Sequence, residues 1–223
     1  MMSGGAPLPT SLIERYKEHG LHLLQGYGST ETSPGILAMD EKAVFTKAGS
    51  VGKQLLHCSA LLFNDSGEQV SPGEIGEIWV KGGNVMQGYW QLDVATQEAF
   101  HGPWFKTGDL ARTDEDGYYY IAGRKKDLII SGGENIYPAE VEDYLISHPD
   151  IKEAAVIGIP DDQWGEIPIA VIVPTRELKA EELITYCRNG LARYKIPKQI
   201  YFKQELPRNA ALSNTLPTTC PLY

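Results

Sequence analysis

The stretch WFKTGDLARTDEDGYYYIAGRKKDLIISGGENIYPAEVE, residues 104–142, decides the fold because the sequence pattern changes within it. Its first half has short apolar runs and the turn pair Asp116-Gly117, which is typical of an antiparallel hairpin. Its second half has Pro138, a residue suited to the first turn of a helix, followed by an apolar stripe at helical spacing. We therefore expect a boundary between two structural units at residues 124–127.

The sequence on either side of this stretch predicts a mixed fold. Short strands separated by turn residues fill residues 49–120 and predict a small antiparallel β-subdomain. SLIERYKEHG predicts a helix before it; after the boundary we expect EAAVIGIP, IPIAVIVP and QIYFKQEL to be strands and AEELITYCRNGLARY to be a helix. The predicted fold class is α/β and α+β, with domains at residues 1–124 and 125–210 and an atypical tail at 211–223.

The composition predicts an ordinary globular protein of a reducing, cytoplasmic environment. Hydrophobic residues make up 42% of the chain and charged residues 22%, and no apolar run approaches the ~20 residues of a membrane span. Cys58, Cys187 and Cys220 are too widely spaced to indicate a zinc site or a disulfide framework. The net charge of −9 argues against nucleic acid as a partner, because phosphate backbones are bound by excess Lys and Arg. We expect a soluble intracellular protein.

Two segments have side chains suited to binding a nucleotide. QGYGSTE, residues 25–31, combines glycines that permit close approach of a ligand with an aromatic ring, hydroxyls and a carboxylate. The hairpin at residues 109–124 should bring Asp109 and Arg124 together, and a carboxylate can accept both ribose hydroxyls while a guanidinium donates to phosphate or ribose oxygens. Taken separately, these residues are also compatible with a helix cap, a turn aspartate and a solvated arginine.

Four segments in this order resemble the adenylate-forming superfamily, the AMP-binding enzymes, in its acyl-CoA synthetase or fatty-acid-CoA ligase branch. They are QGYGSTE, WFKTGDLARTDEDGYYYIAGR, KKDLIISGGENIYPAEVE and VIGIPDDQWGEIP, and the resemblance covers Ser3 to about Ala210. It implies the C-terminal end of the large nucleotide domain, with its β-subdomain, followed by a small mobile α+β domain. The implied ligands are ATP or AMP, Mg²⁺, coenzyme A and a carboxylic acid, for which we expect a fatty acid.

The resemblance also implies roles for individual residues. Tyr27 would lie beside adenine, Thr30 would bond the α-phosphate, and Glu31 would hold Mg²⁺, which makes Thr30 and Glu31 the candidate catalytic residues. Asp109 and Arg124 would bind ribose and phosphate. The implied nucleotide-binding set is Gly26, Tyr27, Gly28, Thr30, Asp109 and Arg124.

A second set of implied roles concerns the acceptor step. Lys126 matches the hinge about which the small domain of such enzymes rotates. Gly132 and Gly133 would border the channel for the pantetheine arm of coenzyme A, because glycines leave room for a narrow ligand. The two glycines are equally compatible with a simple turn before the following helix.

Two departures from the family pattern lead us to expect impaired or absent turnover in this chain. No Ser/Thr/Gly-rich phosphate loop ending in Lys occurs in the sequence, and Ser213 stands where the family has a catalytic lysine. Two alternatives therefore remain open. One is a non-catalytic nucleotide-binding or interaction remnant, and the other is an adenylation enzyme that loads a carrier-protein thiol.

Overall fold

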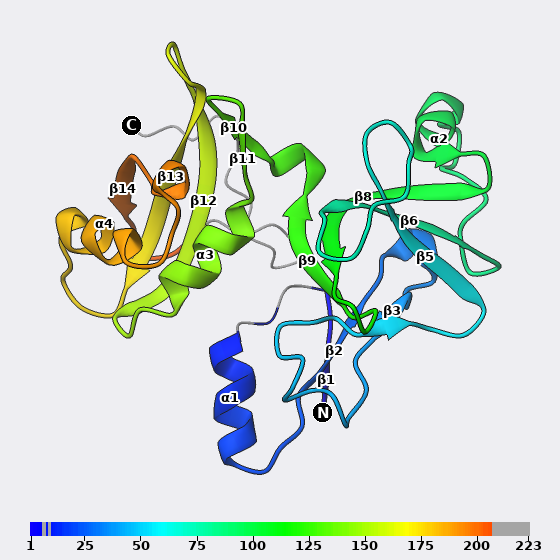
Figure 1. The fold of residues 1–223 in the computed structure, drawn as a ribbon, viewed down its shortest axis with the longest axis horizontal. Helices are drawn as coiled ribbons and strands as arrows, with labels where there is room; N and C mark the ends of the chain where they lie inside the picture. Colours follow the sequence, from blue (N-terminus) through cyan, green and yellow to red (C-terminus); the bar gives the residue numbers. More distant parts are fainter. Residues whose placement is uncertain (6–7, 9, 207–223) are drawn as a thin grey trace. The chain divides into compact units, whose positions relative to one another are not determined.

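The computed structural model describes residues 1–5, 8 and 10–206, and it divides into two compact units, Met1–Lys125 and Lys126–Tyr223 (Figure 1). The division falls within the stretch where the sequence pattern changes. The expectations for the tail at 211–223, including Ser213, lie outside the described residues. Among the described residues, no helix has the length and apolar character needed to cross a membrane.

The first part of the first unit has one α-helix, α1, and a small four-stranded sheet. Ile13 of α1 is 2% exposed and lies in an apolar cluster with Val44 and Tyr118, and the helix gives way to a turn in which Gly20 has a φ of +70°. This helix was predicted. The elements are β1 (Met2–Ser3), α1 (Thr10–Glu18), β2 (Leu24–Tyr27), the 3₁₀ turn η1 (Thr30–Thr32), β3 (Leu37–Ala38) and β4 (Lys53–Gln54), with strand order β1-β2-β3-β4.

The predicted antiparallel β-subdomain is confirmed. Its strands pair in the order β5-β6-β8-β7, with β9 also paired to β8, and every pairing is antiparallel. Ala60, Ile78 and Ala111 are completely buried in its core. The elements are β5 (Cys58–Phe63), β6 (Gly76–Gly82), α2 (Asp93–Ala99), β7 (Phe100–His101), β8 (Trp104–Thr113) and β9 (Tyr119–Arg124).

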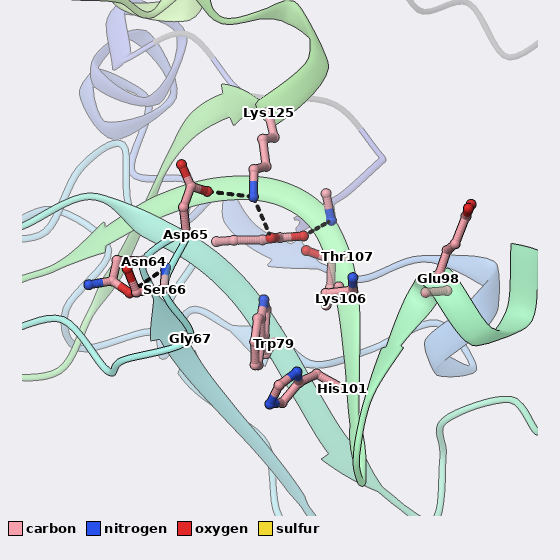
Figure 2. Close-up of a pocket in the computed structure, with 13 residues that line it drawn as sticks. Asn64, Asp65, Ser66, Gly67, Trp79, Glu98, His101, Lys106, Thr107 and Lys125 are labelled. Atoms are coloured by element: carbon pink, nitrogen blue, oxygen red, sulfur yellow. Dashed lines mark hydrogen bonds and ion pairs between the residues drawn. The ribbon is translucent and has the colours of Figure 1, made fainter.

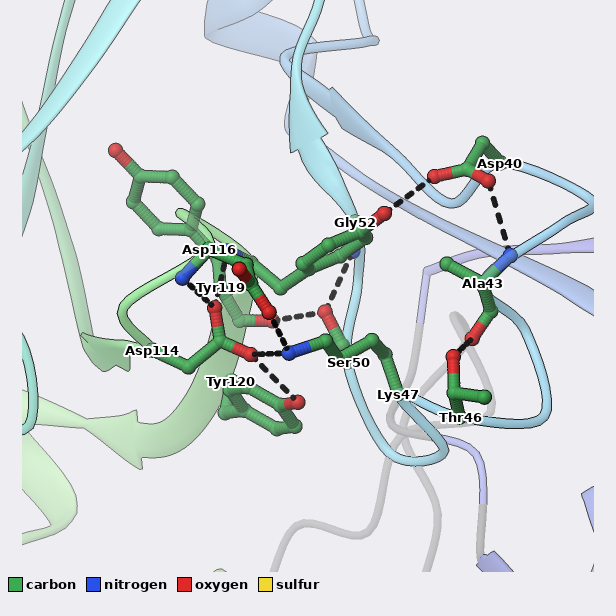
Figure 3. Close-up of polar contacts among 11 residues, drawn as sticks. Asp40, Ala43, Thr46, Lys47, Ser50, Gly52, Asp114, Asp116, Tyr119 and Tyr120 are labelled. Carbon is green, nitrogen blue, oxygen red and sulfur yellow. Dashed lines mark hydrogen bonds and ion pairs between the residues drawn. The ribbon is translucent and has the colours of Figure 1, made fainter.

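A lysine holds the turn of the β8–β9 hairpin in place (Figure 3). Lys47 Nζ donates to Asp114 Oδ2 at 2.7 Å and to Asp116 Oδ2 at 2.5 Å, and these contacts raise the pKa of Lys47. Asp114 also accepts the hydroxyl hydrogen of Tyr120 and the backbone N–H of Tyr118. The hairpin that supplies the two ends at Asp109 and Arg124 is therefore restrained at its tip.

The second unit is a five-stranded sheet with both of its α-helices on one face. Val141 and Leu145 of α3 and Leu183 and Cys187 of α4 are completely buried against it, while the other face packs around Val171 and its neighbours. Strand order is β11-β10-β13-β12, with β14 paired to β13. The elements are the 3₁₀ turn η2 (Lys125–Asp127) at the junction, then β10 (Ile129–Ser131), β11 (Glu134–Ile136), α3 (Pro138–Ile146), β12 (Ile151–Asp161), β13 (Gly165–Pro174), α4 (Ala180–Arg188), η3 (Arg193–Lys195) and β14 (Gln199–Phe202).

The mixed fold class is therefore confirmed, but two elements are shorter than predicted. The helix expected over residues 180–194 ends at Arg188, where Asn189 and Gly190 follow. Gly190 lies against the ring of Tyr144, which a Cβ atom would approach to 2.2 Å, so the chain turns closely over α3 at this point. The last strand stops at Phe202 rather than at residue 206.

Candidate functional site: a buried carboxylate beside a bulge in the β-subdomain

The candidate site begins at an irregularity in β8. Trp79 of β6 pairs with Lys106 and Glu77 pairs with Leu110, so residues 107–109 of β8 face a single residue of β6. Extra residues of this kind form a β-bulge, which bends a strand and redirects its side chains. Within the bulge Gly108 has a φ of +74°, a conformation that glycine adopts without strain. The next residue, Asp109, is therefore aimed by the bulge.

Asp109 joins two strands that are distant in sequence. Its Oδ2 accepts the hydroxyl hydrogen of Tyr27 at 2.5 Å, and its Oδ1 lies 2.7 Å from Nε of Arg124. Arg124 pairs directly across from Asp109 in the β8–β9 ladder, so the hairpin returns the guanidinium to the carboxylate. Arg124 also donates from Nη1 to the carbonyl oxygen of Thr107 at 3.4 Å. Asp109 is 7% exposed, whereas the Arg124 side chain is 53% exposed.

Burial is the main influence on the pKa values of Asp109 and Tyr27. The pKa of Asp109 is raised chiefly by burial, against the opposing effects of the Tyr27 hydrogen bond and the Arg124 charge. The pKa of Tyr27 is also raised, by burial and by the neighbouring charge of Asp109. The phenol therefore stays protonated and donates, and its ring is partly exposed at the edge of the apolar core of this unit.

Glu31 lies close enough to Arg124 for the charges of the two side chains to interact. Its partial burial alone would raise the pKa of Glu31, but hydrogen bonds from its own backbone N–H, from Ser29 and from Tyr89, together with the Arg124 charge, lower it. Tyr89 donates its hydroxyl hydrogen to Glu31 Oε1 at 3.2 Å. The carboxylate is thus held ionised beside an exposed guanidinium.

The segment after β6 braces the turn that presents Glu31. Met86 N donates to the carbonyl oxygen of Glu31 at 2.8 Å, and the Asn84 side chain donates to the carbonyl oxygen of Thr32 at 2.8 Å. Thr32 is completely buried, and its hydroxyl lies 3.0 Å from both the N–H and the carbonyl oxygen of Ser29. Thr30, at the start of η1, is exposed.

Of the two glycines of the predicted nucleotide loop, Gly28 has a structural reason for being glycine. A Cβ atom at Gly28 would lie 1.4 Å from the carbonyl oxygen of Pro34, whereas one at Gly26 would clash only with Cε of Met2, the end of an exposed side chain that can move. Their contact with a ligand remains a prediction. The close packing keeps the backbone of this loop fixed next to Tyr27.

Lys126, Gly132 and Gly133 belong to the second unit. Lys126 is exposed in η2, at the division between the units. Gly132 and Gly133 form the two-residue turn between β10 and β11, with φ values of +61° and +87°. Positive φ at both central residues is the requirement of a type I′ hairpin turn, so turn geometry alone accounts for the glycine pair.

Sequence reasoning missed three residues that support the site: Tyr89, Thr32 and Glu77. Tyr89 and Glu77 act through contacts that no local motif encodes, such as the hydrogen bond from Tyr89 to Glu31, which spans 58 residues. The contacts of Thr32 are local, because its hydroxyl bonds to Ser29 three residues earlier. Glu77 accepts the N–H of Gly108 in the bulge at 3.1 Å. The available sequence signal for Glu77 was an acidic residue next to the apolar run Ile78-Trp79-Val80, since charged side chains are uncommon in such strands.

The described part of the site offers one cationic and two anionic groups around an aromatic ring. This arrangement can accept hydroxyl groups at Asp109, neutralise an anion at Arg124 and pack against a planar ring at Tyr27. No group of three or more His, Cys, Asp and Glu side chains within residues 1–5, 8 and 10–206 could hold a metal ion unaided. A cation at Glu31 would therefore need ligands from a bound molecule, as Mg²⁺ commonly has in phosphate sites.

These features agree with the sequence family of the chain. The profile described as AMP-binding enzyme matches residues 1–90, and that described as AMP-binding enzyme C-terminal domain matches residues 140–211. The chain belongs to this family of adenylate-forming enzymes, as predicted.

Within the family, its similar relatives are acyl-CoA ligases. The chain is 48% identical over 213 residues to the 2-succinylbenzoate-CoA ligase of Geobacillus kaustophilus, covering 95% of this chain and 43% of that enzyme. It is 48% identical over 209 residues to a feruloyl-CoA synthase of Amycolatopsis, covering 93% of this chain and 43% of that enzyme. The chain thus spans less than half the length of these relatives. Neither name contains the fatty acid that we expected; both acids are aromatic.

Solved structures of similar fold also include acyl-CoA ligases. The o-succinylbenzoate-CoA synthetase of Bacillus subtilis, in complex with its acyl-adenylate intermediate, superposes with a TM-score of 0.90 at 44% identity, covering 96% of this chain and 44% of that one. Other crystals of that enzyme contain AMP, or ATP and a magnesium ion. An amide bond synthetase of Marinactinospora thermotolerans superposes with a TM-score of 0.89 at 32% identity, covering 96% of this chain and 44% of that one.

Proposed function

We propose that the first unit of this chain binds the adenosine monophosphate portion of a nucleotide, as part of an enzyme that joins a carboxylic acid to coenzyme A with consumption of ATP. The observation that supports this most strongly is the buried carboxylate of Asp109, held between Tyr27 and Arg124. Asp109 Oδ2 accepts one hydrogen bond from Tyr27 and Oδ1 forms an ion pair with Arg124, and a carboxylate oxygen has a further lone pair for a ribose hydroxyl.

The nucleotide would use the three groups in different ways. The ribose would donate to Asp109, the adenine would pack beside the ring of Tyr27, and the exposed guanidinium of Arg124 would meet ribose or phosphate oxygens. Thr30, exposed beside Glu31 in η1, would donate to the α-phosphate. The bound acyl-adenylate of the Bacillus enzyme supports this proposal, because a chain of the same fold there binds the same class of ligand.

Magnesium would bind at Glu31 with phosphate oxygens completing its ligands. The lowered pKa of Glu31 keeps this carboxylate charged, and a hard oxygen anion is the ligand that Mg²⁺ prefers. When bound, the ion would neutralise charge that develops on the phosphates during adenylate formation. Tyr89 would orient Glu31 by donating to Oε1.

For the acid, we propose an aromatic carboxylic acid in place of the fatty acid, because the similar relatives are named for 2-succinylbenzoate and ferulate. The acceptor would be coenzyme A. Lys126 would be the hinge about which the small domain rotates between adenylate formation and transfer of the acyl group to coenzyme A. The turn at Gly132 and Gly133 would border the path of the coenzyme A thiol. The same fold also occurs in an enzyme named an amide bond synthetase, so the acceptor requires its own test.

Calorimetric titration of the chain with AMP, and separately with coenzyme A, tests this proposal. We expect AMP to bind with 1:1 stoichiometry and GMP to bind more weakly. ATP-pyrophosphate exchange with a panel of aromatic and fatty acids then measures adenylate formation. Binding of AMP and coenzyme A without exchange would favour the non-catalytic alternative, and failure of AMP to bind at all would overturn the proposal.

A further inference from the structure

A second buried carboxylate, that of Glu77, contacts both the bulge beside Asp109 and the side chain of Lys125. Its side chain is 8% exposed, and both of its oxygens are engaged. Oε1 accepts the backbone N–H of Gly108 at 3.1 Å, and Oε2 accepts a hydrogen bond from Lys125 Nζ at 3.1 Å. Lys125 Nζ also lies 2.7 Å from Asp65 Oδ1, and Figure 2 shows the Lys125 side chain reaching toward Asp65.

The bulge in β8 explains why a carboxylate is needed at this position. Residues 107–109 face only one residue of β6, so the ladder does not supply partners for all of their backbone groups. Glu77 supplies the acceptor for Gly108, while the Thr107 hydroxyl donates to the carbonyl oxygen of Ile78 at 2.8 Å. Gly108 is only half-buried, but its N–H points to Glu77, so losing this acceptor would destabilise the bulge.

The charge of Lys125 compensates the buried negative charge of Glu77. The charge of Glu77 is one of the contributions that raise the pKa of Asp109, which places the two carboxylates within each other's field. Lys125 offsets part of that repulsion and, in doing so, ties the last residue of the first unit to β6. The residue next along the chain is Lys126, the proposed hinge.

We propose that Glu77 is a positioning residue that fixes the Thr107–Asp109 bulge for nucleotide binding and anchors Lys125 at the start of the hinge. This inference rests on the proposed function for its effect on AMP, but the hydrogen bonds that carry it are independent of any ligand. Glu77 acts through Asp109 and does not itself touch the nucleotide.

Two substitutions at Glu77 separate its two contacts. Glu77→Gln keeps an oxygen for the Gly108 N–H but removes the charge that holds Lys125, whereas Glu77→Ala removes both. Glu98→Gln is the matched control, because Glu98 and Glu77 both line one surface cavity, but Glu98 lies away from Thr107 (Figure 2). The measurements are amide hydrogen exchange at Gly108 by NMR, the rate of cleavage after Lys125 by a lysine-specific protease, and AMP affinity by calorimetry.

The expected results differ between the variants. Glu77→Ala should raise the exchange rate at Gly108 by at least about tenfold and weaken AMP binding by about tenfold, the equivalent of one ~1.4 kcal/mol hydrogen bond. Glu77→Gln should leave both within about threefold, since the acceptor remains. Cleavage after Lys125 should accelerate in both variants and remain unchanged in Glu98→Gln.

Two results would contradict the proposed roles of Glu77. If Glu77→Ala leaves Gly108 exchange and AMP affinity equal to those of Glu98→Gln, Glu77 does not position the bulge. If Glu77→Ala does not fold, Glu77→Gln with unchanged cleavage after Lys125 would refute the anchoring role. If the unaltered chain does not bind AMP, the proposed function fails, while exchange at Gly108 still decides whether Glu77 holds the turn.

Discussion

Replacing Asp109 with asparagine is the substitution that most sharply separates a nucleotide-binding role from a structural one. The change keeps the size of the side chain and leaves an oxygen for the Tyr27 hydroxyl, but it removes the charge that faces Arg124 at 2.7 Å. Hydrogen bonds that involve a charged group contribute about 1.5–3 kcal/mol. If the ribose donates to this carboxylate, AMP affinity should fall by about ten- to hundredfold, because each ~1.4 kcal/mol is a factor of ten.

Stability should change much less than affinity. The Arg124 side chain is 53% exposed, so its ion pair with Asp109 contributes about 1 kcal/mol or less to folding. Burial also raises the pKa of Asp109, which means that the fold disfavours the charge that asparagine removes. These two effects oppose each other, and the melting temperature should stay close to that of the unaltered chain.

The assay is calorimetric titration with AMP alongside thermal unfolding, with Glu115→Gln as the control. Glu115 lies in the exposed turn of the same hairpin and should keep AMP affinity within about twofold, as surface changes away from a site generally do. AMP affinity of Asp109→Asn within twofold of the unaltered chain would refute the reasoning. A large loss of stability with no separate loss of affinity in the folded fraction would assign Asp109 a structural role instead.

Three further predictions concern stability. Burial raises the pKa of Glu142 to about 7, so this acid destabilises the fold when it is ionised, and the free energy of unfolding should fall as pH rises from about 4.5 to 7. In urea unfolding, Glu142→Gln should reduce that fall by on the order of 2–3 kcal/mol, whereas the exposed control Glu177→Gln should leave it unchanged. Gly28→Ala would place a Cβ atom 1.4 Å from a main-chain carbonyl oxygen and should lower the free energy of unfolding by about 3 kcal/mol or more in the same measurement. At the control position Gly83 a Cβ atom meets nothing within 4 Å, so Gly83→Ala should lower it by about 1 kcal/mol or less. Lys47→Met removes the two carboxylate contacts at the hairpin tip and should lower the melting temperature at low salt, with a smaller loss in 1 M NaCl; an equal loss at both ionic strengths would contradict an electrostatic role.

Local chemistry made part of the fold predictable. The hairpin turn at Asp116-Gly117 and the helix start at Pro138 both depend on conformations that their own residues favour, and both occur where expected. The pairing of Asp109 with Arg124 follows from the same hairpin, since an antiparallel ladder brings its two open ends together. These features needed no information from distant parts of the chain.

The remaining features depend on contacts between distant segments. The hydrogen bond from Tyr27 to Asp109 spans 82 residues and the hydrogen bond from Lys125 to Glu77 spans 48, so neither leaves a local pattern. α2 was not predicted because none of its residues is buried, and periodicity arises only where a face is buried. The helix α4 was predicted too long because the close approach of Gly190 to Tyr144 is a tertiary contact.

A crystal structure of the chain grown with AMP tests the central claim most directly. The account predicts a ribose hydroxyl within about 3 Å of the Asp109 carboxylate, with adenine beside Tyr27 and an oxygen of the nucleotide on Arg124. AMP bound elsewhere on the protein, with no contact to any of these three side chains, would contradict it.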